Sequence, residues 1–139
     1  MAHRMTPEWI TFTPRGDTRG VLVAIEGGTD VPFAIKRVYT LHGFTAGSVR
    51  GGHAHKTLRQ VIVCLAGSCV IDLDDGGIAQ PVTLSDPARG LVLAPMVWHA
   101  MRDFSPGCVL MVLAADHYDE ADYIRERDEF NRRAKAVSA

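Results

Sequence analysis

Between residues 9 and 115 the chain alternates short apolar runs with residues that favour turns. The runs are rich in Val, Ile, Leu and Phe, and Gly, Pro, Asp and Ser interrupt them at intervals of about ten residues. This rhythm predicts an all-β sandwich or barrel. The strands expected from it are Trp9–Thr13, Gly20–Ile25, Phe33–Leu41, His53–His55, Gln60–Leu65, Ser68–Leu73, Ala79–Leu84, Gly90–Leu93, Trp98–Phe104 and Cys108–Ala114.

Two further segments complete the predicted layout. Asp74-Asp75-Gly76-Gly77 predicts a tight hairpin turn, because glycine accepts the positive φ that such turns require. After Ala115 the chain becomes charged, acidic early and basic late, as a helix dipole favours. This stretch predicts a structural C-terminal helix that packs on the outside of the β core through a narrow apolar stripe, formed by Tyr118, Tyr123, Ile124 and Phe130.

Composition narrows the possible partners and compartment. A chain of 139 residues fits one domain, residues 1–139, and its net charge of −1 lacks the basic excess of nucleic-acid-binding proteins. No run is long enough for a signal peptide or a membrane span. The three cysteines, Cys64, Cys69 and Cys108, lie among apolar residues without CxxC spacing, as free thiols do. We therefore expect a cytoplasmic protein that binds neither nucleic acid nor membrane.

The stretch RGGHAHK, residues 50–56, contains the first candidate chemistry. Side chains alternate between the faces of a strand, so His53 and His55 share a face and can both point into a barrel cavity. Gly51 and Gly52 before them allow a bulge or the close approach of a ligand. An imidazole has an unperturbed pKa of about 6.5, which suits general acid–base catalysis near neutral pH. Both histidines are therefore candidate proton-transfer residues.

The same histidines raise the question of a metal ion. In metal-binding β-barrels of the cupin type, HxH is followed by a glutamate and, on a later strand, by a third histidine. GLVLAPMVWH supplies His99, but Arg59 or Gln60 stands where the carboxylate would be. The missing anionic ligand and the nearby positive charge of Arg50, Lys56 and Arg59 disfavour a divalent ion. We expect no metal and no other cofactor.

A cationic cavity would keep the imidazoles neutral and attract an anionic substrate, because arginine grips phosphate through paired hydrogen bonds. In PFAIKRVYTL, alternation places Arg37 and Tyr39 on one face with Phe33 and Ile35. A face that begins apolar and ends polar is typical of a strand that runs from the floor of a barrel to its mouth. The alternative is an edge strand with an exposed Arg37 and a half-buried Tyr39.

Seven stretches together resemble one enzyme family. They are IKRVY, RGGHAHK, QVIVCLAGS, LDDG, the GL…P…WH stretch, FSPGCVLMVLA and YDEADYIRERDEF, in this order from Gly20 to Phe130. The chain thereby resembles the sugar 3,4-ketoisomerases that act on dTDP-4-keto-6-deoxyglucose in unusual deoxysugar biosynthesis. The resemblance implies a cupin-type jelly-roll β-barrel with a C-terminal helix. It also implies a metal-independent homodimer with exchanged N-terminal strands and a dTDP-linked keto-deoxysugar as ligand.

The resemblance also implies roles for residues. The family's catalytic histidines match His53 and His55, its active-site tyrosine matches Tyr39, and the arginine before its glycines matches Arg50. Moving a ketone from C4 to C3 through an enediol needs a base at C3 and an acid at C4, which two histidines can provide while Tyr39 passes a proton between the oxygens.

We expect a second group of residues to bind the substrate. Arg50 or Lys56 can stabilise enolate or diphosphate charge. The terminal YIRERDEF and the loops TPRGDTRG and GGTDVP leave the C4 configuration of the product open. The expected substrate-binding residues are Arg37, Arg50, Lys56, Gln60 and His99.

Three other functions remain open at this point. A metal-dependent cupin, such as a dioxygenase, would use His53, His55 and His99. A non-enzymatic nucleotide-sugar-binding barrel is also compatible, because a fold does not determine a function. A 3,5-epimerase acting on the same sugar is less compatible, because its histidine and tyrosine come from other positions of a longer chain.

Overall fold

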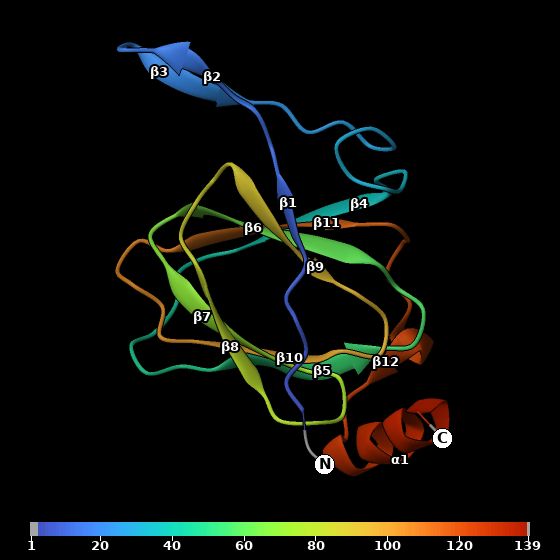
Figure 1. Cartoon of the computed structure of the whole chain (residues 1–139). Helices are drawn as coiled ribbons and strands as arrows, with labels where there is room; N and C mark the ends of the chain where they lie inside the picture. The colour runs from blue at the N-terminus through green and yellow to red at the C-terminus, as the bar shows by residue number, and fades with distance from the viewer. Residues whose placement is uncertain (1–2, 139) are drawn as a thin grey trace.

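The computed structural model, which describes residues 3–138, consists of two facing antiparallel sheets, a separate two-stranded ribbon and one C-terminal α-helix (Figure 1). The first sheet has the strand order β1-β9-β6-β11-β4 and the second the order β12-β5-β10-β7-β8. The elements are β1 (Trp9–Thr11), β2 (Pro14–Asp17), β3 (Gly20–Val23), β4 (Arg37–Leu41), β5 (Arg50–His55), β6 (Gln60–Ala66), β7 (Cys69–Asp74), β8 (Gln80–Leu84), β9 (Arg89–Leu93), β10 (Trp98–Arg102), β11 (Val109–Ala114), η1 (Glu120–Asp122), β12 (Tyr123–Ile124) and α1 (Arg127–Ser138).

This architecture confirms the predicted all-β class, the jelly roll and the C-terminal helix. It differs from the expected barrel in one respect. Within residues 3–138 no strand pairing joins the two sheets, so they form an open, jelly-roll-like sandwich. The hairpin turn predicted at Asp74-Asp75-Gly76-Gly77 connects β7 to β8, which pair in register from Cys69 to Leu73.

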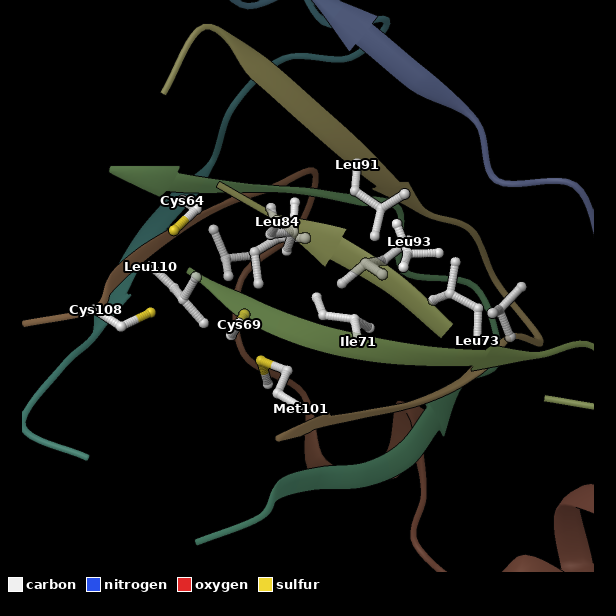
Figure 2. Packing of buried hydrophobic residues seen from close by; sticks show 14 residues of the cluster. Cys64, Cys69, Ile71, Leu73, Leu84, Leu91, Leu93, Met101, Cys108 and Leu110 are labelled. Atoms are coloured by element: carbon white, nitrogen blue, oxygen red, sulfur yellow. The ribbon is translucent and has the colours of Figure 1, made fainter. Parts of the chain in front are cut away.

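The core lies between the sheets and is explained by strand alternation (Figure 2). Strand β6 is central in its sheet, and its first five residues are buried. Ile62 and Cys64 point into the main core, where Figure 2 shows Cys64 near Leu110 of β11. Val61 and Val63 point to the other face, into a second apolar cluster. A strand buried on both faces has a continuous apolar sequence, which is how QVIVCLA reads.

The N-terminal region departs from the predicted pair of long strands. Strand β1 ends at Thr11 and pairs with β9, with Trp9 opposite Leu91. Strand β2 was not predicted, because its sequence PRGD is rich in turn-forming residues. It pairs only with β3, and Figure 1 shows this two-stranded ribbon standing away from the sandwich. Residues 1 and 2 of the predicted domain, and residue 139, lie outside the described part.

The C-terminal region is the largest correction to the prediction. The helix begins at Arg127 rather than just after Ala115. Before it, the chain forms η1 and then β12, which pairs with β5 so that Tyr123 lies opposite His55. Helix α1 inserts Phe130 against Ala54 and Ile124, on the face of β5 opposite the histidines. In the described part of the chain, no helix is long and apolar enough to cross a membrane.

Candidate active site

A cavity of about 350 Å³ opens between the sheets. Part of its wall is apolar and comes from Ile62, Leu93, Met101 and Val112. No acidic side chain of the described residues lines it, so the cavity suits an anionic ligand. Its polar wall consists of Arg37, Tyr39, Arg50, His53, His99, Tyr123 and Arg125.

Backbone geometry at the start of β5 positions His53. Gly51 and Gly52 have φ angles of 86° and 80°, a region that favours glycine. The register between β5 and β10 shifts here, so His53 pairs with His99 while Gly51 pairs with Ala100 and Gly52 is left over. A Cβ atom on Gly51 would lie 3.0 Å from the carbonyl oxygen of His99. The predicted bulge is therefore present, and it turns His53 toward His99.

The three histidines of the two strands form one cluster. The His53 ring lies 5.2 Å from the ring of His55 and 4.7 Å from that of His99, measured between centroids. His53 and His55 share a face, as predicted, but only His53 and His99 line the cavity. His55 is 3% exposed and does not line the cavity, and its ring lies 4.3 Å from that of Tyr123, measured between centroids.

Burial keeps the imidazoles neutral, because it disfavours their charged form. It lowers the pKa of His53 to about 3, and the neighbouring His99, His55 and Arg125 add to the effect. It lowers the pKa of His99 to about 4. Burial also lowers the pKa of His55, where the carboxylate of Asp122 opposes it. Neutral imidazoles were predicted from a cationic cavity, but loss of solvation is the larger cause.

Tyr39 presents its hydroxyl at the cavity with support from Gln60. The Gln60 side-chain amide donates to the Tyr39 oxygen at 2.7 Å, which leaves the phenolic proton free to be donated elsewhere. Burial raises the pKa of Tyr39, so the phenol remains protonated at neutral pH. Gln60 itself is buried and does not line the cavity. Its observed contact is with Tyr39, whereas the sequence predicted a contact with substrate.

Arg37 is held in place without using its hydrogen bonds. Its guanidinium carbon lies 5.3 Å from the ring centroid of Tyr39 and 5.7 Å from that of Tyr118. Its Nε and Nη2 atoms are buried and have no hydrogen-bond partner among the described residues. Unpaired guanidinium donors at a cavity are a strong site for an oxyanion. Arg37 and Tyr39 share one face of β4, as alternation predicted, although the strand begins only at Arg37.

The segment before α1 supplies site residues that the sequence pattern did not indicate. Tyr123 and Arg125 line the cavity, whereas the apolar stripe predicts Tyr123 on a helix. The Arg125 guanidinium donates to both oxygens of the Glu120 carboxylate, at 2.7 and 2.9 Å, and lies 4.2 Å from the centroid of the Tyr123 ring. In the sequence, Tyr123 and Arg125 belong to the stretch YDEADYIRERDEF, which resembles the family but does not by itself assign either residue a role.

Two of the basic residues expected near the cavity point elsewhere. The Lys56 ammonium donates to the carbonyl oxygen of Ala121 at 2.9 Å, and Lys56 does not line the cavity. Arg59 donates to the carbonyl oxygen of Pro32 and packs over the ring of Phe33. The positively charged residues that do line the cavity are Arg37, Arg50 and Arg125.

The histidine cluster also bears on the question of a metal ion. One nitrogen from each of His53, His55 and His99 lies within 4.8 Å of the others, a spacing that three metal ligands could have. The set contains no carboxylate, and three guanidinium groups border the cavity. Three imidazoles can hold a divalent ion without a carboxylate, but the guanidinium groups of Arg37, Arg50 and Arg125 would repel it, so these residues fit a divalent cation poorly.

Comparisons with known proteins identify the family of the chain. The chain matches the family model described as FdtA: WxcM-like, C-terminal, over residues 5–135. It is 55% identical over 123 residues to the TDP-4-oxo-6-deoxy-alpha-D-glucose-3,4-oxoisomerase of Aneurinibacillus thermoaerophilus, and the match covers 88% of each chain.

Solved structures give the same result. The sugar 3,4-ketoisomerase QdtA from Thermoanaerobacterium thermosaccharolyticum, in complex with TDP, is 44% identical, with a TM-score of 0.93 over 96% of this chain and 97% of that one. The TDP-quinovose 3,4-ketoisomerase WlaRB from Campylobacter jejuni is 43% identical, with a TM-score of 0.85 over 91% of this chain and 97% of that one. These matches confirm the resemblance found in the sequence. The chain belongs to the FdtA/WxcM-like family of sugar 3,4-ketoisomerases.

Proposed function

We propose that the protein converts TDP-4-oxo-6-deoxyglucose into the corresponding 3-oxo sugar, in deoxysugar biosynthesis, without a metal ion. This proposal rests on the residues that line one cavity. A neutral imidazole, His53, and a protonated phenol, Tyr39, line it together with three guanidinium groups. Isomerisation of a nucleotide-linked keto sugar requires proton-transfer groups near the sugar and an anion site for the diphosphate. The activities of the named relatives support the same substrate class.

The reaction needs only proton transfers. In the proposal, His53 removes the proton from C3, which is acidic because it is adjacent to the C4 carbonyl, and an enediol forms. Tyr39 moves a proton between the two oxygens, since Gln60 binds its oxygen and leaves its O–H free. Protonation at C4 then leaves the ketone at C3. No net proton or electron is gained or lost.

His55 takes the second acid–base role in the proposal. It lies behind the cavity wall, and a nitrogen of its ring lies within 4.8 Å of one on His53. One water molecule or a small ring rotation can bridge such a distance, and catalytic hydrogen bonds are commonly long before substrate binds. His55 thereby delivers the proton that reaches C4.

The diphosphate is assigned to the guanidinium groups. Arg37 offers two unpaired donors, and Arg50 and Arg125 border the same cavity. Arg125 is already paired with Glu120, so Arg37 and Arg50 are the stronger candidates for direct phosphate contact. His99 borders the sugar site opposite His53.

The proposed assembly is a homodimer with exchanged N-terminal strands, in the cytoplasm. The projecting β2–β3 ribbon supports the dimer, because a two-stranded ribbon without other pairing is marginal in water. The three cysteines are buried and free, which supports a reducing compartment.

Proton NMR of a mixture of the purified protein and TDP-4-oxo-6-deoxyglucose tests the function. We expect signals of a 3-oxo sugar to replace those of the substrate. Binding without conversion would indicate a nucleotide-sugar-binding module, and inversion at C3 and C5 would indicate an epimerase. The same spectrum reports the C4 configuration of the product.

A further inference from the structure

His55 has a carboxylate partner. Its Nδ1 lies 3.5 Å from Oδ2 of Asp122, and the two side chains are 3% and 13% exposed. The two groups make no hydrogen bond at this distance, and neither ring nitrogen of His55 has a hydrogen-bond partner among the described residues. Both side chains are shielded from water, so the electrostatic interaction between them is weakly screened. Asp122 lies at the end of η1, next to the strand β12 that pairs with β5.

The Asp122 carboxylate is fixed in position. Its Oδ1 accepts hydrogen bonds from the backbone N–H and the hydroxyl of Thr57, both at 2.9 Å. Its Oδ2 accepts the backbone N–H of Leu58 at 3.1 Å, and its backbone carbonyl accepts the N–H of Lys56 at 2.9 Å. These contacts tie the carboxylate to the chain that directly follows His55. The carboxylate therefore cannot turn away from the imidazole without breaking them.

The other two histidines of the cluster lack this arrangement. The Nδ1 atom of His99 faces the carbonyl oxygen of Val97 at 3.3 Å. The acidic group that acts on His53 is Glu120, whose carboxylate is bound by Arg125 and by the hydroxyl of Tyr118. Within residues 3–138, His55 is thus the one imidazole of the cluster with a fixed carboxylate at close range.

We propose that Asp122 is a positioning residue for the isomerisation, and that its carboxylate holds His55 as the Nδ1–H tautomer with Nε2 available for proton transfer. This inference rests on the proposed function, in which His55 exchanges a proton with the site. A carboxylate at Nδ1 orients the ring and stabilises the imidazolium that forms transiently. His55 is buried, so without Asp122 that cation would have no compensating charge.

The first experiment compares Asp122→Asn with Asp119→Asn. Asp119 is a matched control, since it lies in the same segment and caps η1 through the N–H of Ala121, a contact that asparagine can keep. We expect Asp122→Asn to lower kcat at least about tenfold and to change KM less than about threefold, because a positioning residue acts on the chemical step. Asp119→Asn should keep both constants. Equal losses in the two variants, or a wild-type kcat in Asp122→Asn, would overturn the proposal.

The second experiment measures the tautomer of His55 in the wild-type protein without substrate, by ¹⁵N NMR of labelled imidazole. We expect the Nδ1–H form, with loss of that preference in Asp122→Asn. An Nε2–H tautomer in the wild type would overturn the proposal even if Asp122→Asn failed to fold. A wild-type protein that shows the Nδ1–H form but does not convert the sugar would contradict the proposed function and leave the Asp122–His55 interaction standing.

Discussion

Burial, more than neighbouring charge, sets the chemistry of the individual histidines. His53 and His99 are neutral because the cavity wall removes their solvation. A neutral imidazole has a free nitrogen that can accept a proton from substrate, and Arg125 adds to burial in keeping His53 neutral before substrate binds.

Replacing either histidine of RGGHAHK by asparagine should remove most isomerase activity. We expect kcat to fall by about 10²-fold or more in His53→Asn and in His55→Asn, because an amide keeps the approximate shape but cannot cycle a proton. Binding of the nucleotide sugar should remain near normal, as measured by calorimetry. Full turnover in both variants would refute proton transfer by this stretch.

The same two variants distinguish the roles of the histidines. If His53 is the base at C3, His53→Asn should abolish exchange of the C3 hydrogen with heavy water, because no enolate forms. His55→Asn should still permit slow exchange while it blocks formation of the 3-oxo sugar. NMR detection of deuterium at C3 decides the point, and the opposite pattern would reverse the two roles.

Chelation should leave the activity intact. The cluster of His53, His55 and His99 has no carboxylate ligand and is bordered by guanidinium groups. After exhaustive treatment with EDTA, turnover should match that of the untreated protein, with the residual metal content measured in parallel. Loss of turnover that zinc, iron or manganese restores would favour the metal-dependent alternative.

Acid should destabilise the fold through the buried histidines. Their pKa values of about 3 for His53 and about 4 for His99 lie below the ordinary value of 6.5, so the unfolded chain binds more protons between these limits. Stability from this source is full above pH 6.5 and declines as the pH falls toward 4. Urea unfolding at several pH values should show this decline, and His99→Gln should make it shallower, since one of the three imidazoles with a lowered pKa is removed. An unchanged slope in His99→Gln would contradict this explanation.

Among the secondary-structure elements, β5 connects the site to the rest of the sandwich. On one face it carries the histidines, and on the other Ala54 packs against Phe130 of α1. Its partners are β10, which brings His99, and β12, which brings Tyr123. Helix α1 thus acts structurally, as predicted, by covering the back of the strand that bears the catalytic candidates.

The bulge in β5 can be tested with two matched glycine substitutions. Gly51 and Gly52 both have positive φ, so alanine at either position should cost about 1–2 kcal/mol from the backbone alone. A Cβ at Gly51 would also crowd the backbone of His99 and Ala100, whereas nothing lies within 4 Å of one at Gly52. Gly51→Ala should therefore reduce the free energy of unfolding and kcat more than Gly52→Ala. Equal effects, measured by urea unfolding and by the NMR assay, would exclude the crowding.

For the whole molecule, the outstanding feature is the β2–β3 ribbon. It pairs with no other strand in the described residues and stands away from the sandwich (Figure 1). Val21 is 70% exposed and Leu22 is 60% exposed. Exposed apolar side chains on an unpaired ribbon are typical of a surface that another chain covers. A second copy of this chain is the proposed occupant, in keeping with the expected homodimer.

Removing the N-terminal region should therefore disrupt assembly. Deleting residues 1–18 takes away β1 and β2, so we expect a monomer or an unstable protein in light scattering. The double change Val21→Ser and Leu22→Ser is a cleaner test, because it keeps β1 paired with β9. A wild-type protein that is a stable, active monomer would contradict the proposed dimer.

Much of this molecule is determined by local sequence. The apolar rhythm indicates ten of the twelve strands found in residues 3–138, because alternation along a strand depends only on neighbouring residues. The same rule puts His53 and His55 on one face of their strand, and Arg37 and Tyr39 on one face of theirs. The glycine pair indicates the bulge through its backbone freedom, and the motifs spread over the chain indicate the family.

Other features depend on contacts between distant segments, and only the tertiary structure decides them. Nothing in YIRERDEF marks a strand, because β12 exists through its pairing with β5, and Asp122 reaches Thr57 across 65 residues of sequence. The pairing of β12 with β5 also buries His55 and brings the carbonyl oxygen of Ala121 within reach of the Lys56 ammonium. Alternation assigns a side chain to a face of its strand, but the segments that pack against that face determine whether it meets solvent, substrate or a carboxylate.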